Sequence, residues 1–341
     1  GCLLMTKYAL ALGTFDGLHK GHLQVLKTTK EFTSHGLVPA MLMFDCHPLK
    51  AVKGITPPLL ITQDDKERLA REFGVLPIPI KFQDIRDLTP EEFVVEILIK
   101  KFNAGAVVSG ENFHFGKNGE GNSKILCELC EKYDIIYQVA ENTTYKGEMI
   151  SSTRIREALS QGDIISANEM LGRNFSYDFL VVEGNRIGKK ILGFPTINQH
   201  FPTGFINLKH GVYASQATVD DVIYPSVTNF GCHPTIGGDK VLSETCILGF
   251  DGDLYNRKIR VELLDFIRAE KKFSSRDELK AQIDKDSKSA IKIFDSKNTK
   301  LTSIDNEIKV VEIENDVKAK EIVQTIDLVN NYDNNITNVE I

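Results

Sequence analysis

The feature that most limits the fold is a series of short apolar segments, each followed by a longer stretch of helical character. These segments are Tyr8–Leu12, Met41–Phe44, Ile78–Phe82, Ala104–Val108 and Ile135–Val139. Each has the length of one buried strand, and strands that alternate with helices form a parallel sheet covered by helices. Thr89-Pro90-Glu91-Glu92 marks one helix start, with a capping threonine, proline at the first helical position and glutamate at the third. The sequence therefore predicts an α/β domain over residues 1–160.

The character of the sequence changes at Phe175, where glycine-punctuated β segments begin. They are Phe179–Glu183, Gly211–Thr218, Val222–Asn229, Glu244–Phe250 and Lys258–Arg268. Short strands with frequent turns indicate a small antiparallel barrel. A capping box, Ser275-Arg276-Asp277-Glu278, then opens a helix toward Phe294. The inward positions expected on this helix are Leu279, Ile283 and Ala290.

These patterns predict a second domain over residues 161–296, a barrel closed by the helix. Residues 297–341 form an extension to which no role is assigned, either a docked helix or a mobile segment. The chain has 341 residues, of which 42% are hydrophobic, and this is ample for two cores.

Composition restricts the partners and the compartment. A formal net charge of -6 argues against nucleic acid as the main partner. Six cysteines are too few for a disulfide framework in this length, and no apolar run approaches the ~20 residues that cross a bilayer. We therefore expect a cytoplasmic protein with no membrane segment. Cys127 and Cys130 form a CxxC without further ligands at suitable spacing, which favours an ordinary helix over a metal site.

A histidine-containing turn follows the first apolar segment directly. It reads Gly13-Thr14-Phe15-Asp16-Gly17-Leu18-His19-Lys20-Gly21-His22. In parallel sheets, ligands sit at the carboxyl ends of strands, where a helix N-terminus offers N–H groups to phosphate. His19 and His22 are three residues apart, so both rings can reach one phosphate chain from the first helical turn. Each histidine or glycine alone would suit a structural role, but their combination predicts a phosphate-binding turn.

Two further segments carry chemistry with open alternatives. Ile150–Arg156 joins hydroxyls and guanidinium groups at the start of a helix, which suits either an oligophosphate or a helix N-cap with solvated arginines. Thr196 and Asn198 lie two apart on an extended chain, so their oxygens point the same way and can share a hard cation. Taken alone, Pro-Thr-x-Asn is a common turn, and the turn is then the favoured interpretation.

Over about residues 6–296 these motifs resemble the bacterial bifunctional riboflavin kinase/FAD synthetase family. The family's GxFDGxHxGH is met in full, and its SSTxIR stands at Ser151–Arg156. Met43–Pro48 is similar to the family's strand-end segment that finishes in HP, with Cys46 at a position where proline is commoner. Gly110–Gly116 is similar to its GxDFxFG segment, with Asn112 where aspartate is usual.

The second half resembles the riboflavin kinase module of the same family. Gly188–Asn198 matches its signature GxxxGxPTxN. Further matches in the family's order are Gly211–Tyr213, Asn229–Thr235, Ser243–Thr245, Asp253–Tyr255 and Ile267–Phe273. Departures near the glutamate of the third match are Cys246, Gly249 and Asn256, where His, Asp and Gly are more usual.

The resemblance implies a Rossmann-like nucleotidyltransferase domain and a six-stranded antiparallel β-barrel with a closing helix. It implies an enzyme that phosphorylates riboflavin to FMN with ATP and then adenylylates FMN to FAD, releasing pyrophosphate. The substrates would be riboflavin, FMN and ATP, and the cofactor Mg²⁺. The sequence gives no indication of the oligomeric state.

The resemblance also implies roles for individual residues. The catalytic residues would be Glu244, His19 and His22. The ATP-binding residues would be Gly13, Phe15, Asp16, Gly17, Gly21, Ser152, Thr153, Arg156, Gly188, Lys189, Gly193 and Pro195. The flavin-binding residues would be His47, Asn112, Phe113, Arg268 and Phe273, although an ion pair and a core aromatic are equal alternatives for the last two. The metal ligands would be Thr196 and Asn198.

Three other hypotheses remain open at this stage. One site could be inactive, most readily the adenylyltransferase site, because Asn112 removes a carboxylate. The chain could instead bind flavin as a regulatory protein without turnover, against which the intact site residues argue. A nucleotidyltransferase with another phosphorylated acceptor would explain the first half of the chain but not the barrel motifs.

Overall fold

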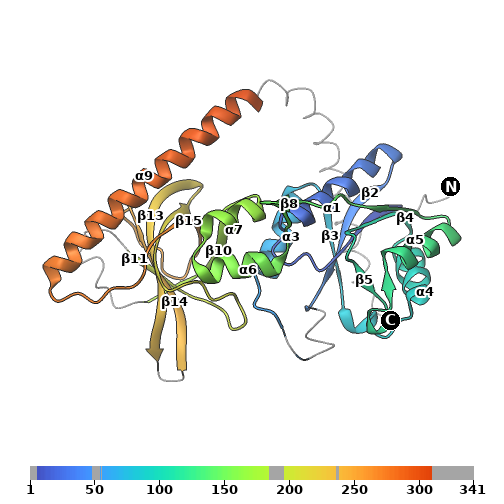
Figure 1. The fold of residues 1–341 in the computed structure, drawn as a ribbon, viewed down its shortest axis with the longest axis horizontal. Helices are drawn as coiled ribbons and strands as arrows, with labels where there is room; N and C mark the ends of the chain where they lie inside the picture. The colour runs from blue at the N-terminus through green and yellow to red at the C-terminus, as the bar shows by residue number, and fades with distance from the viewer. Residues whose placement is uncertain (1–5, 48–53, 55, 184–195, 236–237, 309–341) are drawn as a thin grey trace, which may run out of the picture. The chain divides into compact units, whose positions relative to one another are not determined.

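The computed structural model describes residues 6–47, 54, 56–183, 196–235 and 238–308, with the backbone alone at 232–235, 238–240 and 298–308. The described chain forms two compact units, both drawn in Figure 1. The first comprises Gln63–Met149 together with the described residues of Gly1–Pro57 and Asp305–Ile341. The second comprises Pro58–Thr62 and the described residues of Ile150–Ile304. The domain limits at 160 and 296 stay predictions.

The first unit is built on a five-stranded sheet in the order β3-β2-β1-β4-β7. Its strands are β1 (Tyr8–Leu12), β2 (Val38–Phe44), β3 (Leu76–Ile80), β4 (Ala104–Ser109) and β7 (Ile136–Val139). Every neighbouring pair is parallel. The predicted parallel sheet is confirmed, and each strand overlaps the apolar segment that indicated it.

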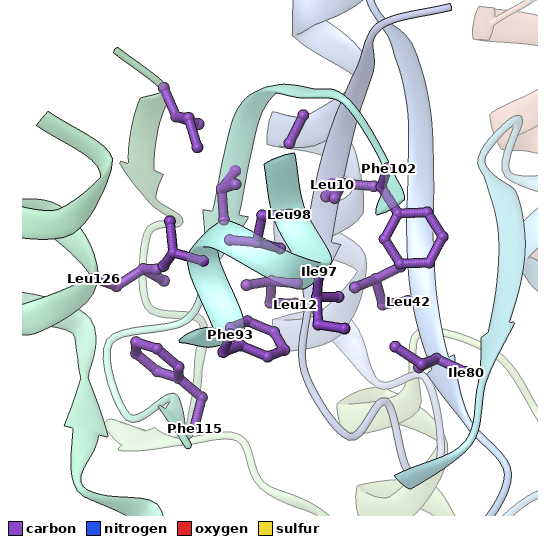
Figure 2. Close-up of a cluster of buried hydrophobic side chains, with 14 of the residues drawn as sticks. Leu10, Leu12, Leu42, Ile80, Phe93, Ile97, Leu98, Phe102, Phe115 and Leu126 are labelled. Carbon is purple, nitrogen blue, oxygen red and sulfur yellow. The ribbon is translucent and has the colours of Figure 1, made fainter. Parts of the chain in front are cut away.

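Helices cover both faces of this sheet. Side chains alternate along each strand, so successive residues pack into the cores on opposite faces. On β1, Ala9 and Ala11 point to the face covered by α1 (Lys20–Glu31) and α3 (Gln63–Glu72). Leu10 and Leu12 point to the opposite face. There they join a core with leucine and phenylalanine side chains from the helical segment before β4 and from the helix before β7 (Figure 2).

The helix predicted at Thr89 begins as expected. The Thr89 hydroxyl accepts from the Glu92 amide at 3.2 Å, and the Glu92 carboxylate accepts from the Thr89 amide at 2.8 Å. α4 (Pro90–Glu92) continues into the π-helical η3 (Phe93–Lys101). The next helix, α5 (Ser123–Lys132), carries Cys127 on its exposed side and Cys130 in the core, where burial raises the pKa of the Cys130 thiol to about 12.

Short elements complete the first unit. They are η1 (Phe32–His35), η2 (Phe82–Asp84), β5 (His114–Phe115), η4 (Lys117–Gly119), β6 (Gly121–Asn122), β8 (Thr144–Tyr145) and β9 (Glu148–Met149).

The second unit begins with α6 (Ser152–Gln161) and α7 (Ile164–Leu171) and continues as a closed barrel in the order β10-β11-β14-β13-β12-β15. The strands are β10 (Phe175–Val182), β11 (Thr196–His200), β12 (Gly211–Val219), β13 (Val222–Thr235), β14 (Gly238–Ile247) and β15 (Lys258–Arg268). All barrel pairs are antiparallel. The predicted six-stranded barrel is confirmed, and β11 contains the Thr196-Ile197-Asn198 segment that was expected to be extended.

β13 and β14 extend beyond the segments that indicated them. Their pairing continues to Thr235 and Gly238, whereas the sequence placed the end of the first strand at Asn229 and the start of the second at Glu244. Gly231 and Pro234 look like turn residues in sequence. Antiparallel pairing with the neighbouring strand, which continues to Thr235 and Gly238, keeps them extended here.

The closing helix is confirmed and is longer than expected, since α9 spans Arg276–Ile308. The Ser275 hydroxyl accepts from the Glu278 amide at 3.2 Å, while the Glu278 carboxylate accepts from Ser274 instead of Ser275. Among the expected inward positions, Ala290 is fully buried and the other two are half-buried. Ala290 packs with Ile293 and Phe294 of the same helix against outward-facing side chains of the barrel.

No helix in the described part of the chain combines the length and apolar character needed to cross a membrane.

Candidate active sites

The order of strands in the first unit creates a switch point beside β1. The chain moves outward from β1 to β2 and β3, then returns to place β4 on the other side of β1. At such a point the connections after the two central strands diverge, and their carboxyl ends form the usual ligand crevice of an α/β sheet. The histidine turn follows β1, and Gly110-Glu111-Asn112-Phe113 follows β4. His47 lies just beyond β2, at the same edge of the sheet.

The two histidines of the turn lie together, as predicted from their spacing. His19 is the N-cap of α1, and its Nδ1 accepts from the His22 amide at 3.3 Å. The rings stack with centroids 3.7 Å apart and planes at 14°. Because Nδ1 of His19 accepts, a neutral His19 ring carries its proton on Nε2, where it can be donated to a phosphate oxygen.

Buried side chains hold this turn in an unusual backbone conformation. Phe15 and Leu18 adopt left-handed φ angles of 50° and 40°. Such angles are costly for residues with a Cβ, but both side chains are almost fully buried. Gly17 has φ 82°, and a Cβ on Gly13 would lie 3.2 Å from the Phe15 ring. The predicted glycines therefore fit a turn built around Phe15, with Asp16 buried inside it and Gly21 in the first turn of α1.

A lysine that the sequence did not indicate also reaches this turn. Lys66 of α3 is half-buried, and its Nζ donates to the Thr14 carbonyl at 3.4 Å. Burial lowers the pKa of Lys66 below the usual lysine value, and the nearby Asp16 carboxylate opposes that shift. No sequence motif links this lysine to a turn so far away in the chain.

The loop after β4 contains the two flavin-side residues predicted in this unit. Asn112 is exposed, and its amide Nδ2 donates to Met149 Sδ at 3.6 Å. Phe113 stacks on Phe115 with ring centroids 5.7 Å apart and planes at 8°. The flavin contacts of Asn112, Phe113 and His47 stay predictions.

The Ile150–Arg156 segment is a helix N-cap in the structure. The Ser151 hydroxyl accepts from the Arg154 amide at 3.3 Å at the start of α6. Arg156 Nε donates to the Pro58 carbonyl at 2.7 Å. Ser152, Thr153 and Arg156 belong to the second unit while the histidines belong to the first. Their shared action on one ATP molecule stays a prediction.

In the barrel, the predicted base lies beside a predicted metal ligand. Glu244 of β14 is directly opposite Asn198 of β11 on one side and Asn229 of β13 on the other. Directly opposite residues of antiparallel strands point to the same face, so the three side chains form one row. Thr196 shares this face because it is two residues before Asn198. Asn229 was not singled out from the sequence, since its place depends on strand register.

The residues of this row fit a divalent cation. Asn198 is 5% exposed, and its Oδ1 accepts no hydrogen bond from any described residue. A buried acceptor without a donor is costly in a folded protein, and a cation would satisfy it. The predicted ATP-binding residues Gly188, Lys189, Gly193 and Pro195 lie outside the described residues.

Arg268, one of the residues predicted to contact flavin, forms a partly buried ion pair. Its Nη2 and Nε donate to Asp286 Oδ2 at 2.8 and 3.0 Å, and its guanidinium lies 5.7 Å from the Phe273 ring centre. The Asp286 side chain is only 3% exposed. The ion pair was one of the two interpretations of Arg268 and joins the end of β15 to α9. Flavin contact by Arg268 and Phe273 stays a prediction.

Replacing Asp286 with alanine should destabilise the barrel unit by about 3 kcal/mol, because Arg268 is left without its buried partner. Asp284→Ala is the matched control, since Asp284 forms an exposed pair with Lys288 and its loss should cost at most ~1 kcal/mol. Urea unfolding followed by circular dichroism measures both. Equal midpoints for the two variants would show that the ion pair does not hold α9.

A histidine turn at the switch point of a parallel sheet, followed by a closed barrel with a glutamate between two asparagines, defines a two-module nucleotide-dependent transferase. Models of known families match both parts, FAD synthetase over residues 4–154 and riboflavin kinase over residues 171–294. The chain belongs to the bifunctional riboflavin kinase/FMN adenylyltransferase family, as its motifs predicted.

Individual relatives agree with this assignment. The bifunctional riboflavin kinase/FMN adenylyltransferase of Bacillus subtilis is 34% identical over 297 residues, which cover 84% of this chain and 93% of the relative. The Escherichia coli K12 protein of the same description is 33% identical over 290 residues, with 84% and 92% covered. A solved structure described as a macrolide-efflux protein from Streptococcus pneumoniae has a TM-score of 0.76 and 28% identity, covering 84% of this chain and 94% of that one.

Proposed function

We propose that this chain makes FAD from riboflavin in two ATP-dependent steps, one in each module. The observation that carries the proposal is the presence, in one chain, of the stacked His19–His22 pair at a sheet switch point and the Asn198–Glu244–Asn229 row in a barrel. The first arrangement suits transfer to a phosphate, and the second suits activation of a hydroxyl beside a cation.

In the adenylyl transfer, a phosphate oxygen of FMN attacks the α-phosphorus of ATP while the bond to pyrophosphate breaks. The attacking phosphate is already ionised, so the protein supplies no nucleophile. It must position the two substrates and stabilise the charge that develops on the phosphate oxygens. His19 and His22 would donate to those oxygens, and Ser152, Thr153 and Arg156 would hold the leaving pyrophosphate.

In the kinase step, the ribityl 5′-hydroxyl of riboflavin attacks the γ-phosphorus of ATP, and ADP leaves. Glu244 would accept the hydroxyl proton as the new bond forms. Thr196 and Asn198 would hold Mg²⁺, which neutralises charge on the phosphate oxygens when bound. Glu244 is half-buried on β14, directly opposite Asn198 and Asn229, which places it beside the proposed metal ligand Asn198.

The proposed partners are therefore riboflavin, FMN and ATP, with no nucleic acid or membrane. A net charge of -6 supports a protein that does not bind nucleic acid. We also propose a cytoplasmic location. The thiols of Cys127, Cys130 and Cys246 are free, as is usual in a reducing compartment.

One observation favours a second candidate, an enzyme with the kinase activity alone. Asn112 removes a carboxylate from the loop after β4, and its amide faces the thioether of Met149. We do not propose macrolide efflux, which the description of the Streptococcus structure names, because efflux would not require the two catalytic arrangements.

A time course with riboflavin, ATP and Mg²⁺ tests these alternatives, with the flavins separated by chromatography. We expect FMN to appear first and FAD to follow. FMN that accumulates without FAD would support the kinase alone and contradict the proposed adenylyl transfer. The absence of any conversion would favour a flavin-binding protein without turnover.

A further inference from the structure

A half-buried lysine beside the histidine turn has no part in the functions described so far. Lys66 is on α3, and its ammonium group donates to the backbone carbonyl of Thr14 at 3.4 Å. Thr14 is the second residue after β1, at the start of the turn that presents His19 and His22. Lys66 therefore places a positive charge at the carboxyl end of the central strand.

A half-buried position has a free-energy cost for a charged lysine unless its ammonium group interacts with a partner. Lysine side chains are seldom buried without a partner, since removing the ammonium from water disfavours its charged form. Burial indeed lowers the pKa of Lys66, and the nearby Asp16 carboxylate opposes that shift. A titratable group with a perturbed pKa at a predicted substrate site is a candidate for function.

The substrates of this site supply a reason for such a charge. ATP, FMN and pyrophosphate are all strongly anionic, and the stacked histidines supply hydrogen bonds from rings that can be neutral. A lysine that is only partly exposed to solvent interacts more strongly with phosphate than a fully solvated one, because water screens the attraction less.

We propose that Lys66 is a further catalytic residue of the adenylyl-transfer site, where its ammonium group binds the polyphosphate that becomes pyrophosphate. This proposal rests on the proposed adenylyltransferase function. In the free protein the Thr14 carbonyl and Asp16 hold the ammonium at the turn. In the complex, phosphate oxygens of ATP or pyrophosphate add to these partners.

The competing explanation is structural, with Lys66 doing no more than fastening α3 to the turn through Thr14. The reverse reaction separates the two explanations, because FAD and pyrophosphate are then separate substrates with separate KM values. It also reports on the adenylyl-transfer site alone, since the kinase step uses no pyrophosphate. A lysine that binds polyphosphate affects the KM for pyrophosphate selectively, whereas a loosened turn affects both substrates and the thermal stability.

The experiment compares the full chain with its Lys66→Met, Lys66→Arg and Lys27→Met variants in the reverse reaction. Lys27 is an exposed lysine of α1 in the same unit and is the matched control. For Lys66→Met we expect a ~10- to 100-fold higher KM for pyrophosphate, as for loss of a charged hydrogen bond, and a KM for FAD within about twofold. Lys66→Arg should recover part of the affinity, and Lys27→Met should match the parent chain.

The melting temperature and the rate of FMN formation from riboflavin are measured for every variant. An unchanged KM for pyrophosphate in Lys66→Met would overturn the proposal. Equal increases in both KM values, or a lower melting temperature without rescue by arginine, would also overturn it and leave Lys66 a structural residue. If the unmodified chain converts neither FMN to FAD nor FAD to FMN, the proposed adenylyltransferase function is wrong. If the unmodified chain is active but Lys66→Met has the same KM for pyrophosphate, only the role of Lys66 is wrong.

Discussion

Glu244→Ala should lower the rate of FMN formation from riboflavin and ATP by about 10²- to 10⁴-fold, the range that a positioned general base contributes. Glu244 lies between Asn198 and Asn229 in one row across three strands, so its carboxylate is placed beside the proposed cation ligands. Removing it leaves the strand pairing intact, because the row is formed by side chains and the ladder by backbone groups. We expect a folded barrel that binds ATP but phosphorylates riboflavin very slowly.

Three measurements make this result specific. Glu244→Gln should lose as much activity as Glu244→Ala, since glutamine keeps the shape but accepts no proton at neutral pH. Glu169→Ala, which changes an exposed glutamate of α7, should retain full activity. FAD formation from added FMN should persist in all three variants. A parallel loss of both activities in Glu244→Ala would contradict two separate sites.

The central strands of the sheet, β1, β2 and β4, could be predicted from the sequence because each is a compact apolar run buried on both faces. β1 has the bounds that were expected, and its alternating residues reach two different cores. The barrel was harder to define, since its long hairpin of β13 and β14 contains residues that usually mark turns. There the pairing between strands determines the backbone conformation, and a single sequence does not reveal that pairing.

The candidate sites also contain some residues that the sequence could predict and others that it could not. The histidine turn could be predicted because all its parts lie within ten consecutive residues. Its stacked rings belong to His19, the N-cap of α1, and to His22 in the first turn of that helix. Lys66 and Asn229 could not be predicted as site residues. Lys66 reaches its site through the packing of α3, and Asn229 reaches its site through the register of β13. Asp286 was missed for a related reason. A carboxylate on the inward face of a helix looks unfavourable until its partner Arg268 is known.

His22→Ala should have the opposite effect to Glu244→Ala, lowering FAD formation from FMN and ATP by about 10²- to 10³-fold while FMN formation persists. The variant should fold, because the contact that caps α1 runs from the backbone amide of residue 22 to His19 Nδ1 and needs no imidazole at this position. What is lost is a ring stacked on His19 and placed edge-on to Phe15.

The expected loss in His22→Ala therefore comes from two sources, one hydrogen-bond donor to the phosphates and the support that keeps the His19 ring in position. His35→Ala removes an exposed histidine from the same unit and should leave both activities unchanged. Initial rates of both reactions, measured at saturating ATP, distinguish the outcomes. Normal FAD formation in His22→Ala would mean that the turn binds phosphate through its backbone and His19 alone, and the catalytic role assigned to His22 would have to be withdrawn.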